Sequence, residues 1–267
     1  VGTSNTVLGP GAGSNATGSF RNSVAIGTDA LRSGNIQGNT AVGYRAMRGT
    51  TTGSNNVAVG SGSLEINSTG ANNVAIGGSA LFINTGGNNT AVGGNSCLGN
   101  GSNLTNCTAV GNTAGSGAGV GGVAASNLTC IGYNAEPSAA GASDEVTLGD
   151  ANVATLRCQV TSITSLSDAR DKKDVEDANI GLDFINDLRP VKFVWDTRDG
   201  AKKDIKEVGF IAQELDEVQQ KHGVEDHLQL VLKNNPDKLE ASQGKLIPIL
   251  VQAIKDLKKE IDELKKA

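Results

Sequence analysis

The sequence is poor in aromatic residues, and residues 1–167 contain neither lysine nor histidine. Aromatic residues make up only 3% of the 267 residues, which excludes a core built on large rings. Residues 1–167 carry six acidic and five basic side chains, and so few cations argue against nucleic-acid binding. No apolar run reaches the length of a membrane span, so we expect no membrane insertion.

Cysteine and histidine are also scarce, and the spacing of the four cysteines and two histidines matches no zinc site. We therefore predict no metal and no other cofactor. The cysteines are interpreted as reduced, partly buried thiols of a protein assembled in a cytosol. Cys97 and Cys107 could still meet across one turn and form a late disulfide. His222 and His227 are interpreted as surface residues.

Glycine is abundant, and a short apolar phrase that ends in glycine recurs along residues 1–150. The phrases at 24–27, 57–60 and 74–77 are examples, and successive closing glycines lie 16 to 21 residues apart. Three or four β-forming residues followed by glycine predict one short strand and a tight turn. The period is too short for a pair of helices. Each unit is therefore expected to form one turn of a parallel β-roll or β-helix.

A second apolar pair follows each closing glycine by about three residues, as in Ala30-Leu31 and Ala80-Leu81. Stacked turns would bury a thin column of Val, Ile, Leu and Ala. Asn-Asn or Asn-Thr often precedes the strand, and Asn tolerates left-handed backbone in turns. A single turn buries little apolar surface, and oligomerisation is the usual remedy for a chain that lacks core.

The phrase NNVAIGGSA at 72–80 resembles the head repeats of trimeric autotransporter adhesins and similar repeats of phage tail fibres. This resemblance implies that residues 1–150 form a trimeric β-roll that serves as a shaft or head. The units here are about 17 residues long, which is longer than the adhesin repeat. Residues 151–166 are expected to form connecting strands.

The sequence after residue 167 is charged and helix-forming, with 22 acidic and 18 basic side chains in its last 100 residues. A short helix is expected before Pro190, a strand at 191–195, and a strand running into a helix at 207–215. Residues 234–237 read as a turn. The sequence therefore predicts a mainly β repeat followed by a small α+β domain.

Four motifs follow one another in this domain: SDxxxK at 167–172, LRPVxFxW at 188–195, GFIAQE at 209–214 and LIPILVxAI at 246–254. Together they resemble the C-terminal intramolecular chaperone of phage tail spikes, neck appendages and endosialidases. The resemblance covers about residues 165–267, with the domain itself at 167–267. It implies a domain that helps three chains fold together and then releases itself by autoproteolysis.

Carried onto this chain, the resemblance makes Ser167 the nucleophile, Lys172 the base and Ser167–Asp168 the bond that is cut. A serine hydroxyl attacks only when a base takes its proton, and lysine serves when burial lowers its pKa. The neighbouring Lys173 is an alternative base, but the family spacing selects Lys172. The working pair could lie within one chain or come from adjacent subunits. Without the other motifs, Ser-Asp followed by Lys would favour a helix cap.

Two residues of the GFIAQE motif are further candidates. Gln213 and Glu214 match the family signature and would support the cleavage site, or else serve packing and hydrogen bonding. The C-terminal residues 246–266 carry apolar residues at alternating steps of three and four, which is typical of a coiled-coil seam. The alternative is one amphipathic helix packed on its own domain. The seam residues are Ile247, Leu250, Ile254, Leu257, Ile261 and Leu264.

The leading hypothesis is a homotrimeric phage tail fibre or spike component, placed in the virion tail and assembled in the host cytoplasm. Its partners would be other tail proteins and a host surface glycan or protein receptor, and its only catalysis would be single-turnover serine autoproteolysis. One alternative is a glycan depolymerase, but only Asp144 and Glu145 lie together among the six acids of residues 1–167. The other is a bacterial trimeric surface adhesin, for which a membrane anchor would be expected after the repeats.

Overall fold

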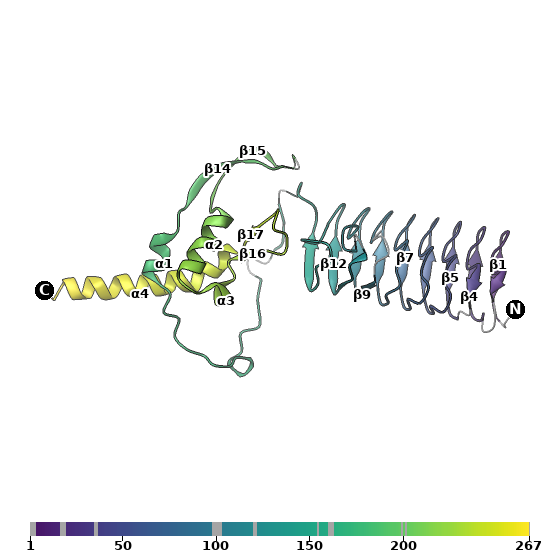
Figure 1. Ribbon diagram of the computed structural model, residues 1–267, viewed down its shortest axis with the longest axis horizontal. Coiled ribbons are helices and arrows are strands. Elements are labelled where there is room, and N and C mark those ends of the chain that lie inside the picture. The colour runs from purple at the N-terminus through teal and green to yellow at the C-terminus, as the bar shows by residue number, and fades with distance from the viewer. Residues whose placement is uncertain are drawn as a thin grey trace. The chain divides into compact units, whose positions relative to one another are not determined.

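The computed structural model describes residues 4–16, 20–34, 37–97, 103–119, 122–153, 155–159, 163–198, 200 and 202–266. The chain divides into two compact units, Val1–Val153 and Ala154–Ala267 (Figure 1). The first is a β-solenoid and the second contains helices and short antiparallel strands. Each unit is described by itself below.

The solenoid is built on one parallel sheet of nine short strands, each one turn beyond the last (Figure 1). Every neighbouring pair is parallel and in register, which confirms the predicted β-roll. The strands are β1 (Thr6–Leu8), β3 (Val24–Ile26), β5 (Thr40–Val42), β6 (Val57–Val59), β7 (Val74–Ile76), β8 (Thr90–Val92), β10 (Thr108–Val110), β12 (Leu128–Ile131) and β13 (Glu145–Leu148).

Outside this sheet the turns of the solenoid are paired more sparsely. β2 (Asn15–Ala16) pairs with β4 (Ser33–Gly34), and β9 (Leu104–Thr105) pairs with β11 (Ala125–Ser126), both in parallel. Isolated bridges between Arg21 and Gln37 and between Ile66 and Ile83 also join consecutive turns. The turns are therefore held by one continuous sheet and by scattered pairs elsewhere.

Two columns of apolar side chains fill the interior of the solenoid. The central alanine of each strand of the nine-stranded sheet from β3 to β10 is completely buried. The second column is also completely buried and is formed by the residues that follow the turn, Leu31, Met47, Leu64 and Leu81. These four have left-handed backbone with φ between 46° and 54°, which is rare for large residues and turns their side chains inward here.

The closing glycines stack on one another from turn to turn. Gly60 has φ of 131°, and a Cβ placed on it would lie 2.5 Å from the carbonyl oxygen of Gly77. Gly43 and Gly77 meet the next glycine at similar distances, 2.5 and 2.4 Å. Because no side chain fits at this separation, the periodic glycine in the sequence is a requirement of the stacking itself.

A buried ladder of asparagines runs parallel to these columns. The Oδ1 atoms of Asn39, Asn56 and Asn73 accept the backbone N–H of the equivalent asparagine one turn on, at 2.8 to 3.0 Å. Their Nδ2 atoms donate to backbone carbonyls at Gly53, Gly70 and Gly86, at 2.9 to 3.0 Å. One chain therefore fills its own interior and satisfies the side chains of these asparagines, and it needs no second chain to complete this core.

The second unit places a layer of short elements on a long terminal helix. Its core is formed by Phe184, Leu215, Leu228, Leu230, Val231, Leu246 and Ile249. The elements are η2 (Ala169–Asp171), α1 (Leu182–Asp187), β14 (Val191–Asp196), β15 (Lys203–Gly209), α2 (Ala212–Lys221), α3 (Glu225–Leu228), β16 (Val231–Leu232), β17 (Glu240–Ala241), η3 (Gln243–Lys245) and α4 (Leu246–Leu264). The helices and strands expected before Pro190, at 191–195 and at 207–215 are confirmed.

The connecting strands predicted within 151–166 are wrong for the part of this segment that the structure describes. Residues 151–153, 155–159 and 163–166 form no strand, and residues 154 and 160–162 lie outside the described residues. Leu156, Ile163 and Leu166 are exposed to 68%, 96% and 81%. Their apolar character suggested a strand, but the segment lacks the closing glycine that lets each turn stack on the next.

Candidate functional site

Ser167 and Lys172 are in direct contact within one chain. The Lys172 Nζ atom donates a hydrogen bond to the Ser167 Oγ atom at 2.8 Å. The intervening residues Ala169–Asp171 form a 3-10 turn, and its last bond runs from the Lys172 N–H to the Ala169 carbonyl. This turn reverses the chain so that residues five positions apart can meet.

Asp168 provides the cap of that turn. Its carboxylate accepts hydrogen bonds from the backbone N–H of Arg170 at 2.9 Å and from the Arg170 side chain. These bonds, the side-chain ones first, lower the pKa of Asp168. The helix-cap interpretation therefore applies to Asp168, and it leaves the Ser167 hydroxyl available to Lys172.

The structure distinguishes the two neighbouring lysines. Lys172 contacts Ser167, whereas the Lys173 Nζ lies 3.6 Å from the carboxylate of Asp174. Ser167 and both lysines are exposed in the single chain. A lysine becomes a base at neutral pH when burial disfavours its charged form. The single chain thus holds the contact that a Ser-Lys pair needs, and it does not supply the burial.

Glu214 lies in the first turn of α2 and is bound to Arg189 of the LRPVxFxW motif. The Arg189 Nε donates to Glu214 Oε2 at 3.0 Å, and the Arg189 Nη2 donates to Glu214 Oε1. This paired contact raises the pKa of Arg189. Gln213 is exposed at the start of the same helix. The structure supports the hydrogen-bonding role of Glu214, while a role of either residue in cleavage stays a prediction.

Helix α4 uses one side for its own domain and leaves another side uncovered. Leu246, Ile249 and Ala253 are buried. The seam residues lie on a different side and are 43% to 77% exposed: Ile247, Leu250, Ile254, Leu257, Ile261 and Leu264. Packing on its own domain, the alternative considered for this helix, therefore accounts for the first set and leaves the seam without a partner in one chain.

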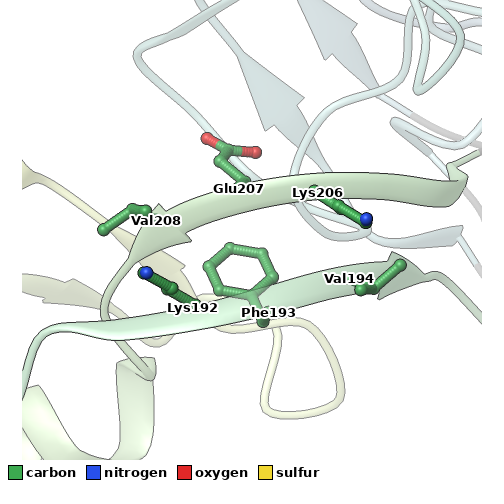
Figure 2. A pocket seen from close by; sticks show the side chains of 6 residues that line it. All are labelled: Lys192, Phe193, Val194, Lys206, Glu207 and Val208. Atoms are coloured by element: carbon green, nitrogen blue, oxygen red, sulfur yellow. The ribbon is translucent and has the colours of Figure 1, made fainter.

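The antiparallel ribbon of β14 and β15 frames a shallow hollow of about 400 Å³ (Figure 2). Figure 2 shows the ring of Phe193 between the two strands, with Lys192 and Lys206 beside it. On the same ribbon Phe193 stacks edge to face on Trp195, with ring centres 5.1 Å apart. The residues lining the hollow include no hydroxyl or thiol nucleophile, so we interpret it as a surface feature of the ribbon.

His222 is not the surface residue that the sequence suggested, since its side chain is only 23% exposed. Its Nε2 lies 2.6 Å from Asp187 Oδ2, and its ring packs edge to face on Phe184. Hydrogen bonds from Lys221 and then His222 lower the pKa of Asp187. The sequence does not indicate this contact, because the partners of the imidazole are 35 and 38 residues away. His227 is exposed, as expected.

The two adjacent acids of the solenoid are engaged locally. Asp144 accepts a hydrogen bond from Asn127 Nδ2 at 2.8 Å. Glu145 accepts from the backbone N–H and the hydroxyl of Ser138 at 2.8 and 2.7 Å. Both carboxylates therefore stabilise the last turns, and nothing in this arrangement favours the depolymerase alternative.

The cysteines of the solenoid replace other core residues. Cys130 takes the central position of β12, opposite Ala109 of β10, and Cys107 follows Asn89 in the asparagine ladder. Cys97, Cys107 and Cys130 are buried free thiols, so the disulfide between Cys97 and Cys107 is not formed in this structure. Burial raises the pKa of each of the three thiols, that of Cys130 to about 11.

Among the described residues, no group of three or more His, Cys, Asp or Glu side chains is placed to hold a metal ion. The part of the chain that the structure covers also has no helix with the length and apolar character needed to cross a membrane.

Residues 167–224 match the family model described as chaperone of endosialidase. The match begins at Ser167 and includes Lys172 and the motifs LRPVxFxW and GFIAQE. No curated protein and no solved structure matches the chain. The second unit therefore contains a C-terminal intramolecular chaperone domain of the type found in endosialidase tail fibres.

Proposed function

We propose that the chain is part of a phage tail fibre or tail spike whose C-terminal domain aligns three copies and then detaches by cutting the Ser167–Asp168 bond. One observation carries the proposal: the family match begins at Ser167, and within it Lys172 donates a hydrogen bond to the Ser167 hydroxyl. The solenoid would then be the product that remains in the virion tail, joined to other tail proteins. There it would meet a glycan or protein receptor on the host surface.

The seam of α4 supports the assembly of three copies. Six apolar side chains at coiled-coil spacing are exposed in the single chain, on a helix that already packs its other side on the domain. Burying such side chains against equivalent helices contributes about 1.5–3 kcal/mol for each one that becomes fully covered. The domain therefore folds around its own core, and its seam remains exposed to pack against the α4 helices of other copies.

A domain that sets the register would solve an alignment problem that the repeated turns of the solenoid create. Its turns are nearly identical, so a neighbouring chain could pair with it in several shifted alignments of similar energy. A globular domain that joins three chains at equivalent residues removes this ambiguity. Folding could then spread along the solenoid from turn to turn.

The bond chosen for the cut constrains how the serine attacks it. Attack of Ser167 Oγ on the carbonyl carbon of its own residue would close a strained four-membered ring. A cut of Ser167–Asp168 is therefore proposed to use the hydroxyl of one copy on the carbonyl of another. Such an attack becomes efficient only when assembly holds the copies in place.

Lys172 acts first as a base and then as an acid in the proposed cut. The Lys172 amine takes the proton of Ser167 Oγ in its own chain, and Oγ bonds to the Ser167 carbonyl carbon of the neighbouring copy. The C–N bond to Asp168 breaks, and the ammonium of Lys172 returns the proton to the departing amine. Water then hydrolyses the ester, which restores the Ser167 hydroxyl and leaves a carboxylate on the cut chain.

Assembly would also supply the burial that Lys172 lacks in the single chain. Covering the exposed loop around Ser167 by neighbouring copies would disfavour the charged form of this lysine and make it a base. Cleavage would thus follow trimer formation and would not precede it. Once the domain has left, the solenoid cannot return to the alignment step, and the fibre is held by a kinetic barrier.

The test compares the full chain carrying Ser167→Ala with a chain synthesised without residues 168–267. The uncut full chain should sediment with three times its mass of 27.1 kDa. The shortened chain should be monomeric or aggregated, because nothing aligns its turns. Soluble trimers from the shortened chain would contradict the chaperone role.

A further inference from the structure

The outward face of the nine-stranded sheet carries two parallel rows of side chains. Strand side chains alternate between faces, so the first and third residues of each three-residue strand point away from the buried alanine between them. The first row mixes threonine and valine. The third-position row, here called the aliphatic row, is formed by Leu8, Ile26, Val42, Val59, Ile76, Val92, Val110, Ile131 and Leu148.

The composition of the aliphatic row goes beyond what a strand requires. Threonine suits an exposed strand position as well as valine does, and it occupies five of the nine places in the first row. None of the nine places in the aliphatic row is threonine. Six of its members are exposed, from 36% at Val59 to 66% at Leu8. A row this regular and apolar is typical of a surface that another protein covers.

The same face is almost free of charge. Within the nine strands as described, Glu145 is the one ionisable carboxylate, and it is held by Ser138. The ion pairs of the solenoid lie outside these strands, where Arg48 is 3.5 Å from Glu65 and Arg32 is 3.6 Å from Asp29. Depletion of charge at its centre is the compositional mark of a protein interface.

The size of the face indicates how it would be used. Nine strands spaced about 4.8 Å apart make a strip about 40 Å long, and its two rows make it about 10 Å wide. Its area of about 400 Å² is half of the roughly 800 Å² that each partner buries in a stable interface. The strip alone is too small to hold chains together. It can stabilise the contact between chains only when another element has already joined them.

We infer that the outward face of the sheet is the contact between copies of this chain, with the aliphatic rows of neighbouring solenoids packed side by side along the fibre. This inference rests on the proposed trimer. Three solenoids joined at their C-terminal domains by equivalent residues run parallel and in the same register. Their rows share one spacing, so each aliphatic side chain meets its equivalent over all nine strands.

Cysteine cross-linking of the full chain tests this contact. Ile76→Cys places a thiol in the aliphatic row, and Cys158→Ser removes the exposed native thiol from the background. The matched control is Ile66→Cys, since Ile66 is 45% exposed, Ile76 is 40% exposed, and Ile66 lies outside the nine-stranded sheet. After mild oxidation and denaturation without reductant, Ile76→Cys should yield about tenfold more linked chains than the control, because neighbouring thiols reach about millimolar effective concentration.

A second pair of variants probes the same face without a new bond. Ile76→Lys brings like charges together in the contact and should lower the denaturant concentration at which the trimer dissociates, whereas Ile66→Lys should leave it unchanged. If the full chain sediments as a trimer but neither Ile76 variant differs from its control, the inferred contact is overturned and the proposed function stands. A full chain that sediments as a monomer overturns both.

Discussion

Arg189 and Glu214, which lie 25 residues apart, are joined by two hydrogen bonds between guanidinium and carboxylate. The contact links the LRPVxFxW motif to the GFIAQE motif and fixes the start of α2 against the segment that precedes β14. A planar, two-bond contact of this kind is specific to arginine. It gives a physical reason for a residue that the sequence alone offered as a possible part of the cleavage site.

Glu214→Gln should therefore lower the thermal stability of the domain and leave its cleavage activity intact. Glutamine can accept one bond from Arg189 but carries no charge, so the melting temperature of the domain should fall slightly. The rate of cleavage in assembled protein should stay at the wild-type value. Gln213→Ala, at an exposed position beside it, should change neither quantity. Loss of cleavage in Glu214→Gln at an unchanged melting temperature would instead place Glu214 in the cleavage site.

Thr50→Asn should stabilise the solenoid. Asn67, one turn further on, accepts the Gly70 N–H at 2.8 Å and donates to the Gly70 carbonyl at 2.9 Å. Thr50 occupies the equivalent corner, is completely buried, and its hydroxyl has no hydrogen-bond partner among the described residues. Asparagine there would reach Gly53 in the same way and raise the free energy of unfolding by about 1 kcal/mol.

The reverse change provides the control for this prediction. Asn67→Thr should lower the free energy of unfolding by about 1–3 kcal/mol, because it removes the side-chain acceptor of the buried Gly70 N–H, while the Gly70 carbonyl keeps its bond from Asn56. Chemical denaturation of the two variants beside the wild type measures both values. A Thr50→Asn protein that is less stable than wild type would show that the corner has no room for the amide.

The stability of the solenoid should fall in alkali through its buried thiols. Burial raises the pKa of Cys130 from its ordinary value of 9.0 to about 11. The unfolded chain loses this proton near pH 9 and the folded chain keeps it until about pH 11, so the stabilisation is complete below pH 9 and is lost between these values. Melting curves at about pH 8 and about pH 10 measure this loss.

Cys130→Ala should reduce the alkaline loss, because alanine occupies the equivalent position of β10 and does not ionise. Some loss should remain, since the pKa values of Cys97 and Cys107 are also raised by burial. An unchanged difference between the two melting curves would show that other groups cause the loss.

Ile254→Asp should abolish trimers without unfolding the domain. Ile254 is 65% exposed in the single chain, so its replacement leaves the core intact, but it lies in the middle of the seam of α4. Three carboxylates brought together there would repel one another. Sedimentation should give a single-chain mass for Ile254→Asp and a trimer for Lys255→Asp, whose side chain is exposed beside the seam. Trimers of the first variant would exclude the seam as the joining surface.

The sequence predicted the solenoid well because its geometry repeats. The glycine at each turn has no room for a side chain, as at Gly60, and this makes the period visible. The asparagine ladder was harder to foresee, since a buried asparagine and an exposed turn asparagine are adjacent and look alike, as at Asn72 and Asn73. The ladder explains why one chain fills its own core, which the small size of each turn had argued against.

The candidate site was predictable where it is local. Ser167 and Lys172 are five residues apart, and one 3-10 turn brings them together. The pairing of Arg189 with Glu214 and of Asp187 with His222 depends on the tertiary fold, and no spacing in the sequence predicts it. The sequence also could not predict that Lys172 is exposed in one chain. This exposure is the reason for proposing that cleavage requires assembly.

Self-cleavage is measured by the mass of the polypeptides in purified, assembled protein. We expect two polypeptides for the wild type, one ending at Ser167 and one beginning at Asp168, and one polypeptide of 27.1 kDa for Ser167→Ala and for Lys172→Met. A wild-type protein that stays at 27.1 kDa after it has formed trimers would contradict self-cleavage. A smaller polypeptide beginning at Ser167 would contradict attack between copies, because the hydroxyl reaches the Leu166 carbonyl of its own chain through an unstrained five-membered ring.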